Sequence, residues 1–150
     1  MVISSLAATS QTAKTLVNVD RAGVALHGYS ATSYNGEDSP GKGNPQYRSV
    51  YHGAIYLFEN VAEKEKFERN PEHWTPLFGG FCVYGVSQGR LDDVNPARYI
   101  RYSMDRELYP EGKLLLFQDS NAFAQFSNDW DGNLKKAMTN WSALVASRGQ

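Results

Sequence analysis

The chain contains one cysteine, Cys82, within the aromatic and glycine-rich stretch FGGFCVYG at residues 78–85. A cysteine can act as a nucleophile, as a metal ligand, or as a small apolar residue that packs in a tight corner. No cation lies beside it in the sequence to favour the reactive thiolate, and Gly79 and Gly80 permit a sharp turn. The sequence therefore favours the packing role, while metal binding and thiol chemistry stay open.

Three histidines, His27, His52 and His73, could join Cys82 at a metal site. Thiolate and imidazole ligands suit Cu(I) and Zn, so such a site would bind copper or zinc. No two of these histidines have the i, i+4 spacing of a helical metal motif, so the fold would have to bring them together. The same residue types could also form a Cys–His catalytic pair, which requires the base within hydrogen-bond reach of the thiol.

Aromatic residues offer a further kind of site, since the chain has nine Tyr and seven Phe. Aromatic side chains that line one concavity can bind a small apolar or aromatic ligand. The candidates for this role are Tyr29, Tyr56, Phe81 and Tyr84. Ordinary packing within a sheet is the favoured interpretation of the same residues.

Composition excludes several classes of protein. With 150 residues the chain is long enough for one domain with its own core. Its net charge of −1 predicts no nucleic-acid binding, and a single cysteine cannot form an internal disulfide. No apolar run is long enough for a membrane span, so a soluble protein is expected. The sequence also lacks a phosphate-binding loop, a dinucleotide fingerprint and a nucleophile elbow.

The pattern of elements predicts an α+β fold. Strands are expected over 47–51 and 54–58, joined by a turn at His52 and Gly53. A helix over 61–69 should follow, with Asn60 as its N-cap and Glu63 completing a capping box. Strands are likewise expected over 98–104 and 113–117, and then a short capped helix within 119–129.

Two stretches of the sequence resemble each other at an offset of 59 residues. GAIYLFENVAEKEKFERNPEHW and GKLLLFQDSNAFAQFSNDW share a glycine, a Leu-Phe pair, a capping residue and a later Phe. We interpret them as two strand–helix units on a single mixed or antiparallel sheet.

The last predicted element is an amphipathic helix packed on that sheet. Its apolar stripe comprises Leu134, Ala137, Met138, Trp141, Leu144 and Val145. Residues 1–16 are expected to form a flexible arm, and residues 17–146 the domain itself.

Four segments in order resemble the YHS-domain family, and in particular its small stand-alone bacterial members. These segments are VNVDRAGVALHGYSATSY, GKGNPQYRSVYHGAIYLFEN, KFERNPEHWTPLFGGFCVYGVSQG and GNLKKAMTNW, which extend from Val17 to Trp141. The resemblance implies a non-enzymatic binding or sensing module, because copies of this domain occur in metal-handling proteins. The metal-associated pattern of the family has two cysteines that this chain lacks: Ser30 and Ala31 replace the usual Asp-Pro, no Cys follows them, and Glu59 occupies the second cysteine position.

The resemblance leaves location and partners open. Stand-alone relatives often carry an export signal, so a periplasmic protein with its signal removed and a cytoplasmic protein are both consistent with it. A transition-metal binder, a thiol-dependent enzyme using Cys82, and a structural or protein-interaction domain, with or without self-association into a homo-oligomer, stand as alternative functions.

Overall fold

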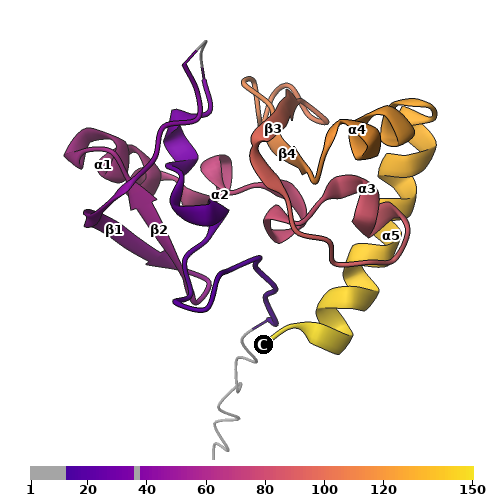
Figure 1. The fold of residues 1–150 in the computed structure, drawn as a ribbon, viewed down its shortest axis with the longest axis horizontal. Helices are drawn as coiled ribbons and strands as arrows, with labels where there is room; N and C mark the ends of the chain where they lie inside the picture. The colour runs from indigo at the N-terminus through magenta and orange to yellow at the C-terminus, as the bar shows by residue number, and fades with distance from the viewer. Residues whose placement is uncertain (1–12, 36–37) are drawn as a thin grey trace, which may run out of the picture.

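The computed structural model describes residues 13–35 and 38–150, which form two lobes (Figure 1). The first lobe contains β1 (Asn44–Tyr51), β2 (Ala54–Phe58) and α1 (Val61–Arg69). The second contains α3 (Val83–Ser87), β3 (Asn95–Tyr102), β4 (Lys113–Phe117), α4 (Ser120–Ser127) and α5 (Trp130–Arg148), and α2 (Pro71–Trp74) lies between the lobes. Short 3₁₀ turns occupy Leu26–Gly28, Ala31–Ser33 and Leu77–Gly80. The predicted α+β class is confirmed.

The first hairpin and its helix form at the predicted places, although β1 begins at Asn44, three residues earlier than predicted, and the Glu63 side chain does not bond back to Asn60 to complete the predicted capping box. Strands β1 and β2 pair in antiparallel fashion around His52 and Gly53, whose φ values of 50° and 76° are those of a tight two-residue hairpin turn. The Asn60 side chain then accepts a hydrogen bond of 2.9 Å from the backbone N–H of Glu63. This bond satisfies one of the free donors at the start of α1 and so defines where the helix begins.

The second hairpin repeats this arrangement. Strands β3 and β4 are antiparallel, and the Asp119 side chain caps α4 by accepting a hydrogen bond of 2.8 Å from the N–H of Ala122. Strand β3 begins at Asn95, three residues earlier than predicted, and ends at Tyr102.

The structure extends the sequence repeat in the N-terminal direction, and we call residues 26–69 unit one and residues 78–127 unit two. In each hairpin we call the first strand, β1 or β3, the outer strand and the second, β2 or β4, the inner strand. Each outer strand begins with Asn-Pro, and the pairing register shifts once, directly after that asparagine. The turns that open the two units also match. Leu26, His27 and Gly28 have φ values of 56°, 52° and 84°, and residues 78–80 have 55°, 61° and 82°. Two stretches of unlike sequence therefore adopt the same unusual left-handed backbone.

The prediction of a single sheet is wrong, because the two hairpins remain separate two-stranded sheets. The edge of β2 that faces away from β1 is already occupied, and so is the edge of β4 that faces away from β3. Val24 forms an isolated parallel bridge to Ile55 in β2, and Cys82 forms one to Leu116 in β4. Since these edges of β2 and β4 are taken by segments that precede each hairpin in the sequence, β2 and β4 do not pair with each other.

Helix α5 packs on α3 in unit two and extends to Arg148, two residues beyond the predicted end of the domain. Leu134 and Ala137 are buried as expected, but Met138 is 51% exposed. The buried side of the helix instead includes Asn133, whose side chain donates to the carbonyl of Phe126. Most of the predicted N-terminal arm, residues 1–12, lies outside the described residues.

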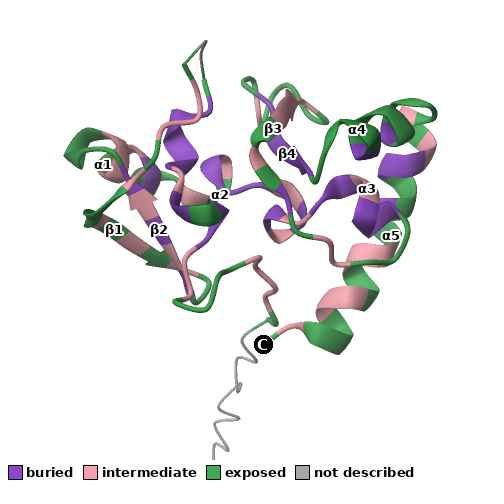
Figure 2. Cartoon of the chain, in the orientation of Figure 1, coloured by how far each residue is buried: buried purple, intermediate pink, exposed green. Residues whose placement is uncertain are grey.

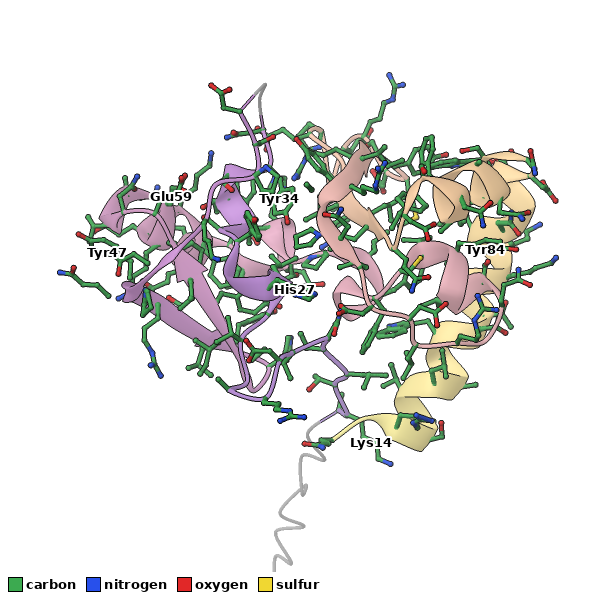
Figure 3. The ribbon with its side chains drawn as sticks, viewed as in Figure 1. Lys14, His27, Tyr34, Tyr47, Glu59 and Tyr84 are labelled. Carbon is green, nitrogen blue, oxygen red and sulfur yellow. The ribbon has the colours of Figure 1, made fainter. Side chains whose placement is uncertain are left out.

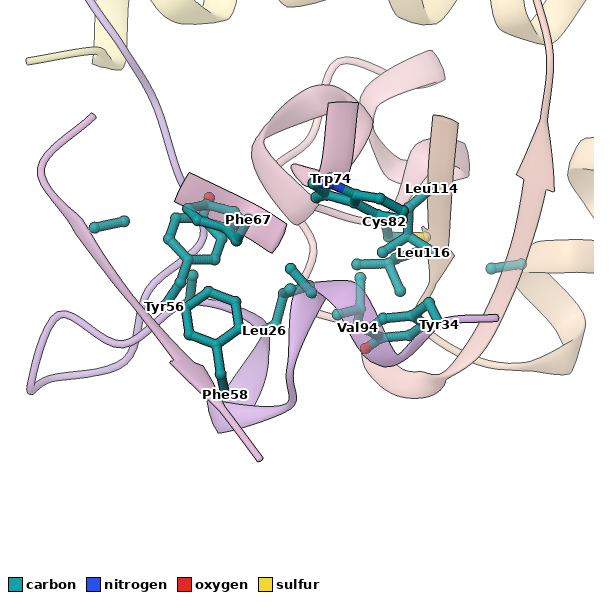
Figure 4. Close-up of a cluster of buried hydrophobic side chains, with 14 residues drawn as sticks. Leu26, Tyr34, Tyr56, Phe58, Phe67, Trp74, Cys82, Val94, Leu114 and Leu116 are labelled. Carbon is teal, nitrogen blue, oxygen red and sulfur yellow. The ribbon is translucent and has the colours of Figure 1, made fainter. Parts of the chain in front are cut away.

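The hydrophobic core joins the two units. One buried cluster contains Tyr56, Phe58 and Phe67 of unit one together with Cys82 and Leu116 of unit two (Figure 4). A second cluster lies between β4, α4 and α5. Buried segments occur in both lobes and between them (Figure 2). Because the first cluster contains residues of both units, we expect the units to unfold together.

Candidate ligand-binding site

A cleft of about 420 Å³ lies where the two units meet, and we call it the seam cleft. Unit one contributes the tip of its hairpin and Tyr56, and unit two contributes Lys113, the first residue of β4. The connection 75–79, one side of α5 and the N-terminal segment 14–17 complete the lining. A volume of this size is typical of pockets that bind small molecules.

The N-terminal segment is held across the cleft by backbone hydrogen bonds. Thr15 exchanges two of them with Gln150, at 3.0 and 2.9 Å, and the N–H of Asn18 donates to the carbonyl of Gly79 at 2.8 Å. A Cβ atom at position 79 would lie 2.1 Å from the carbonyl oxygen of Leu16, so only glycine permits this close approach. These contacts therefore hold the N-terminal segment in place as part of the cleft wall.

Much of the cleft wall is apolar or aromatic. Phe78 and Trp141 pack edge to face, with ring centroids 5.9 Å apart. Tyr56 is only 2% exposed and packs its ring against Phe67. The Tyr56 hydroxyl forms no hydrogen bond within the described part of the chain, and burial raises its pKa. This hydroxyl therefore stays protonated and is free to bond with a ligand.

The mouth of the cleft carries an acid. The hydroxyl of Tyr51 donates to Oε2 of Glu72 at 2.9 Å, and Glu72 is exposed. Burial, followed by the hydrogen bond to this carboxylate, raises the pKa of Tyr51. The carboxylate is therefore held in place at the rim, where it gives the entrance a negative charge.

Lys113 is the most unusual residue of the site, since it is only 3% exposed. Its Nζ donates to the carbonyl oxygen of Glu72 and lies 5.2 Å from the centroid of the Tyr109 ring. Burial lowers the pKa of Lys113. A lysine is rarely buried to this extent without a carboxylate partner, and the described residues supply none within ion-pair distance.

Cys82 lies in the shared core, beside Leu114 and Leu116 (Figure 4). It is 1% exposed, and its Sγ accepts a hydrogen bond of 3.3 Å from the N–H of Gln118. Its own N–H donates to the carbonyl of Asp92. This environment fits the packing role and gives a reactant no route to the sulfur.

The three histidines are placed apart, each beside a different partner. Nε2 of His27 lies 2.8 Å from Asp93, and Nε2 of His73 lies 2.9 Å from Glu111. His52 occupies the hairpin turn, and its ring contacts that of the preceding tyrosine at a tilt of 59°, with ring centroids 4.0 Å apart.

These histidines and Cys82 do not assemble into a metal site. Within residues 13–35 and 38–150, no group of three or more His, Cys, Asp or Glu side chains converges on one point. The donors among the described residues therefore do not fit the copper or zinc site that the sequence suggests, and we assign no metal chemistry to them.

The two histidine–acid pairs have a simpler role. Burial raises the pKa of Asp93, but the hydrogen bonds from Asn18 and His27 outweigh this effect and lower the pKa overall. The hydrogen bond from His73 likewise lowers the pKa of Glu111. Both acids stay ionised, as expected of pairs that hold loops in place.

One of the four aromatic candidates reaches the seam cleft. Tyr56 lines it, whereas Tyr29, Phe81 and Tyr84 pack against the buried clusters instead. Tyr84 lies on α3 in the second lobe, and His27 lies near the junction of the lobes (Figure 3). The single aromatic concavity predicted from these four residues does not form.

A second pocket, of about 540 Å³, lies in unit one, and most of its lining residues have polar side chains. Thr32, Ser33, Glu59, Glu63 and Lys66 are among its lining residues. Both carboxyl oxygens of Glu63 are buried. Burial, and then the neighbouring Glu59, raises the pKa of Glu63.

Sequence reasoning missed the residue that distinguishes the seam cleft. Lys113 opens the strand KLLLF, in which every residue is buried, and a charge within such a strand was the available signal. Trp141 was assigned to the stripe of the last helix, and nothing in the sequence placed it opposite Phe78.

Comparison with family models, with curated proteins and with solved structures gave no match to this chain. The resemblance to YHS domains therefore stays a prediction. In the described ranges, no helix combines the length and apolar character needed to cross a bilayer.

Proposed function

We propose that the chain is a non-enzymatic binding module that takes a small, mostly apolar organic molecule in the seam cleft. The observation that carries this proposal is the cleft itself, whose walls combine apolar and aromatic side chains with a comparable share of polar groups. Its volume is typical of a small-molecule site, and the polar groups can fix the orientation of a ligand on the apolar surface. The resemblance to YHS domains supports a binding role in general.

The position of the cleft also supports binding. It is lined by the tip of one hairpin, the start of the other, the terminal helix and the N-terminal segment, so a ligand there would contact both units. Binding would therefore stabilise the whole chain against unfolding, by an amount that grows with ligand concentration.

Binding of a fragment library, followed by ¹H–¹⁵N NMR, tests this proposal. Hits should shift the backbone resonances of residues that line the seam cleft, such as Leu16, Gly79 and Val145. Shifts confined to other surfaces, or no hits at all, would contradict it.

A pair of variants on α5 provides a matched control. Ser142 is exposed and lines the cleft, whereas its neighbour Ala143 is exposed and does not. Ser142→Trp should block the cleft and remove the shifts, and Ala143→Trp should leave them unchanged. Equal binding by both variants would place the ligand elsewhere.

A further inference from the structure

We infer that Lys113 anchors the ligand through a carboxylate, so that the seam cleft selects small monocarboxylic acids with an apolar body. This inference rests on the proposed binding function and specifies the chemistry of the ligand. It is drawn from the hydrogen bonding of Lys113, from its counterpart in unit one, and from the distribution of charge in the cleft.

The ammonium group of Lys113 has unused hydrogen-bonding capacity. It has three N–H donors, and within the described residues it forms one hydrogen bond, to the carbonyl oxygen of Glu72. The contact with the Tyr109 ring supplies no hydrogen-bond acceptor of the usual kind. Because Nζ belongs to a cleft-lining residue, an anion bound there could accept the remaining donors.

The repeat shows that the scaffold does not require a lysine here. Position 113 follows the left-handed Gly112 at the start of β4, and the counterpart in unit one is Ala54, which follows the left-handed Gly53 at the start of β2. Both residues are buried, at 3% and 1% exposure. Alanine therefore suffices to form the hairpin, and the single hydrogen bond of Lys113 to the carbonyl of Glu72 leaves most of the cost of burying its charge uncompensated.

Charge at the mouth limits the number of anionic groups on the ligand. Glu72, fixed by Tyr51, places a carboxylate at the rim while Lys113 lies within. A ligand with one carboxylate directed at Lys113 and an apolar remainder avoids this rim charge. A second anionic group on the ligand would be repelled where it lies beside Glu72, and the other exposed charged side chain of the lining is Lys14, on the N-terminal segment.

The apolar walls define the rest of the ligand. Phe78, Trp141 and the ring of Tyr56 present aromatic surface, and Leu16 and Val17 present aliphatic surface. The Tyr56 hydroxyl, which has no partner in the described chain, is a further donor in the same cleft. An arylalkanoic acid satisfies all of these features.

A matched series of ligands tests the inference on the unmodified protein. We would titrate 3-phenylpropionate, its neutral amide, 3-phenylpropylamine and acetate by NMR, following the cleft resonances. The acid should bind at least tenfold more tightly than the amide, and neither the amine nor acetate should compete with it. Equal affinity of acid and amide, preference for the amine, or binding of acetate as tight as that of the acid would each overturn the inference.

Variants then locate the anchor. Lys113→Met keeps the side-chain length without the charge and should reduce the affinity for the acid to that for the amide. Lys66→Met is the matched control, because Lys66 lies over the Trp74 ring and does not line the seam cleft. Unchanged affinity in Lys113→Met, with its fold verified by circular dichroism, would contradict the inference.

The two proposals can fail separately. If library fragments shift the cleft resonances but the acid shows no preference over its amide, the binding function stands and the role of Lys113 is wrong. If no compound shifts those resonances, both proposals fail.

Discussion

Units one and two have the same backbone plan but bury different chemistry. Unit one places Ser30 after its left-handed turn, Glu63 in the first turn of its helix and Ala54 at the start of its inner strand. Unit two places Cys82, Ala122 and Lys113 at the corresponding positions. Unit one thus has a polar pocket beside its helix, whereas unit two has an apolar interior with one buried cation.

We infer from this comparison that the scaffold requires the turn, the hairpin and the helix cap, whereas it does not require the buried polar groups. The features kept in both units are those that set backbone direction, namely the left-handed turns, the opening Asn-Pro and the capping side chains. The residues that differ are those with chemical capacity, so function is to be sought among them.

The largest expected effect comes from a phenylalanine that occupies the equivalent helix position in both units. Phe67 and Phe126 are 1% and 0% exposed, and each packs on the phenylalanine that ends the inner strand of its unit. Either Phe→Ala change should lower the free energy of unfolding by about 3–5 kcal/mol, through lost burial and a cavity. Urea denaturation followed by circular dichroism measures this loss.

Both variants should still unfold in one transition, because the first buried cluster contains residues of both units. Two separate transitions, with only one of them moved by each mutation, would show that the units are independent.

Exchange of the residues after the left-handed turns has a smaller effect. Cys82→Ser places a hydroxyl where unit one already has the buried Ser30, but among leucines rather than beside Thr32. We expect a loss of about 1–2 kcal/mol, the cost of burying a hydroxyl in apolar surroundings. Ser30→Ala should cost less, since the Thr32 hydroxyl keeps its hydrogen bond to the carbonyl of Glu63.

The reactivity of the thiol provides an independent check on this environment. In native protein, alkylation of Cys82 should be slow and should accelerate only in urea, because the sulfur is buried. Rapid alkylation of the native chain at neutral pH would instead favour the alternative of a thiol-dependent enzyme.

The smallest expected effect concerns Glu63, whose counterpart in unit two is Ala122. Since burial raises the pKa of Glu63, the folded protein binds its proton more tightly than the unfolded chain does. Its contribution to stability is therefore full below the unfolded pKa, near 4.3, and is lost as the pH rises through the folded pKa.

Glu63→Gln removes this dependence and should raise the free energy of unfolding by about 1 kcal/mol at pH 7. Thermal unfolding at pH 4 and at pH 7 measures the change. Equal gains at both pH values would show that ionisation of Glu63 is not the cause.

Much of the fold could be predicted because its signals are local. The hairpin turn at His52, the caps at Asn60 and Asp119 and the period of the last helix each act within a few residues. The separation of the two sheets could not be predicted in this way, since it depends on Val24 and Cys82 reaching the edges of strands more than 30 residues later.

The site was predicted less well, for the same physical reason. Tyr56 was identified as a ligand-binding candidate from its aromatic character, but its neighbours in the cleft come from β4, α5 and the N-terminal segment. Cys82 drew attention because it is a rare residue type, and it is buried in the shared core. Lys113 begins a predicted strand, and nothing local in the sequence indicates that its charge faces a cleft.

The most direct test of the central claim is a crystal structure of the protein with 3-phenylpropionate. We predict a phenyl ring between Tyr56 and Trp141 in the seam cleft, with a carboxylate oxygen about 2.7–3.2 Å from Nζ of Lys113. A carboxylate directed to solvent, or an empty cleft with the acid bound at another surface, would contradict it.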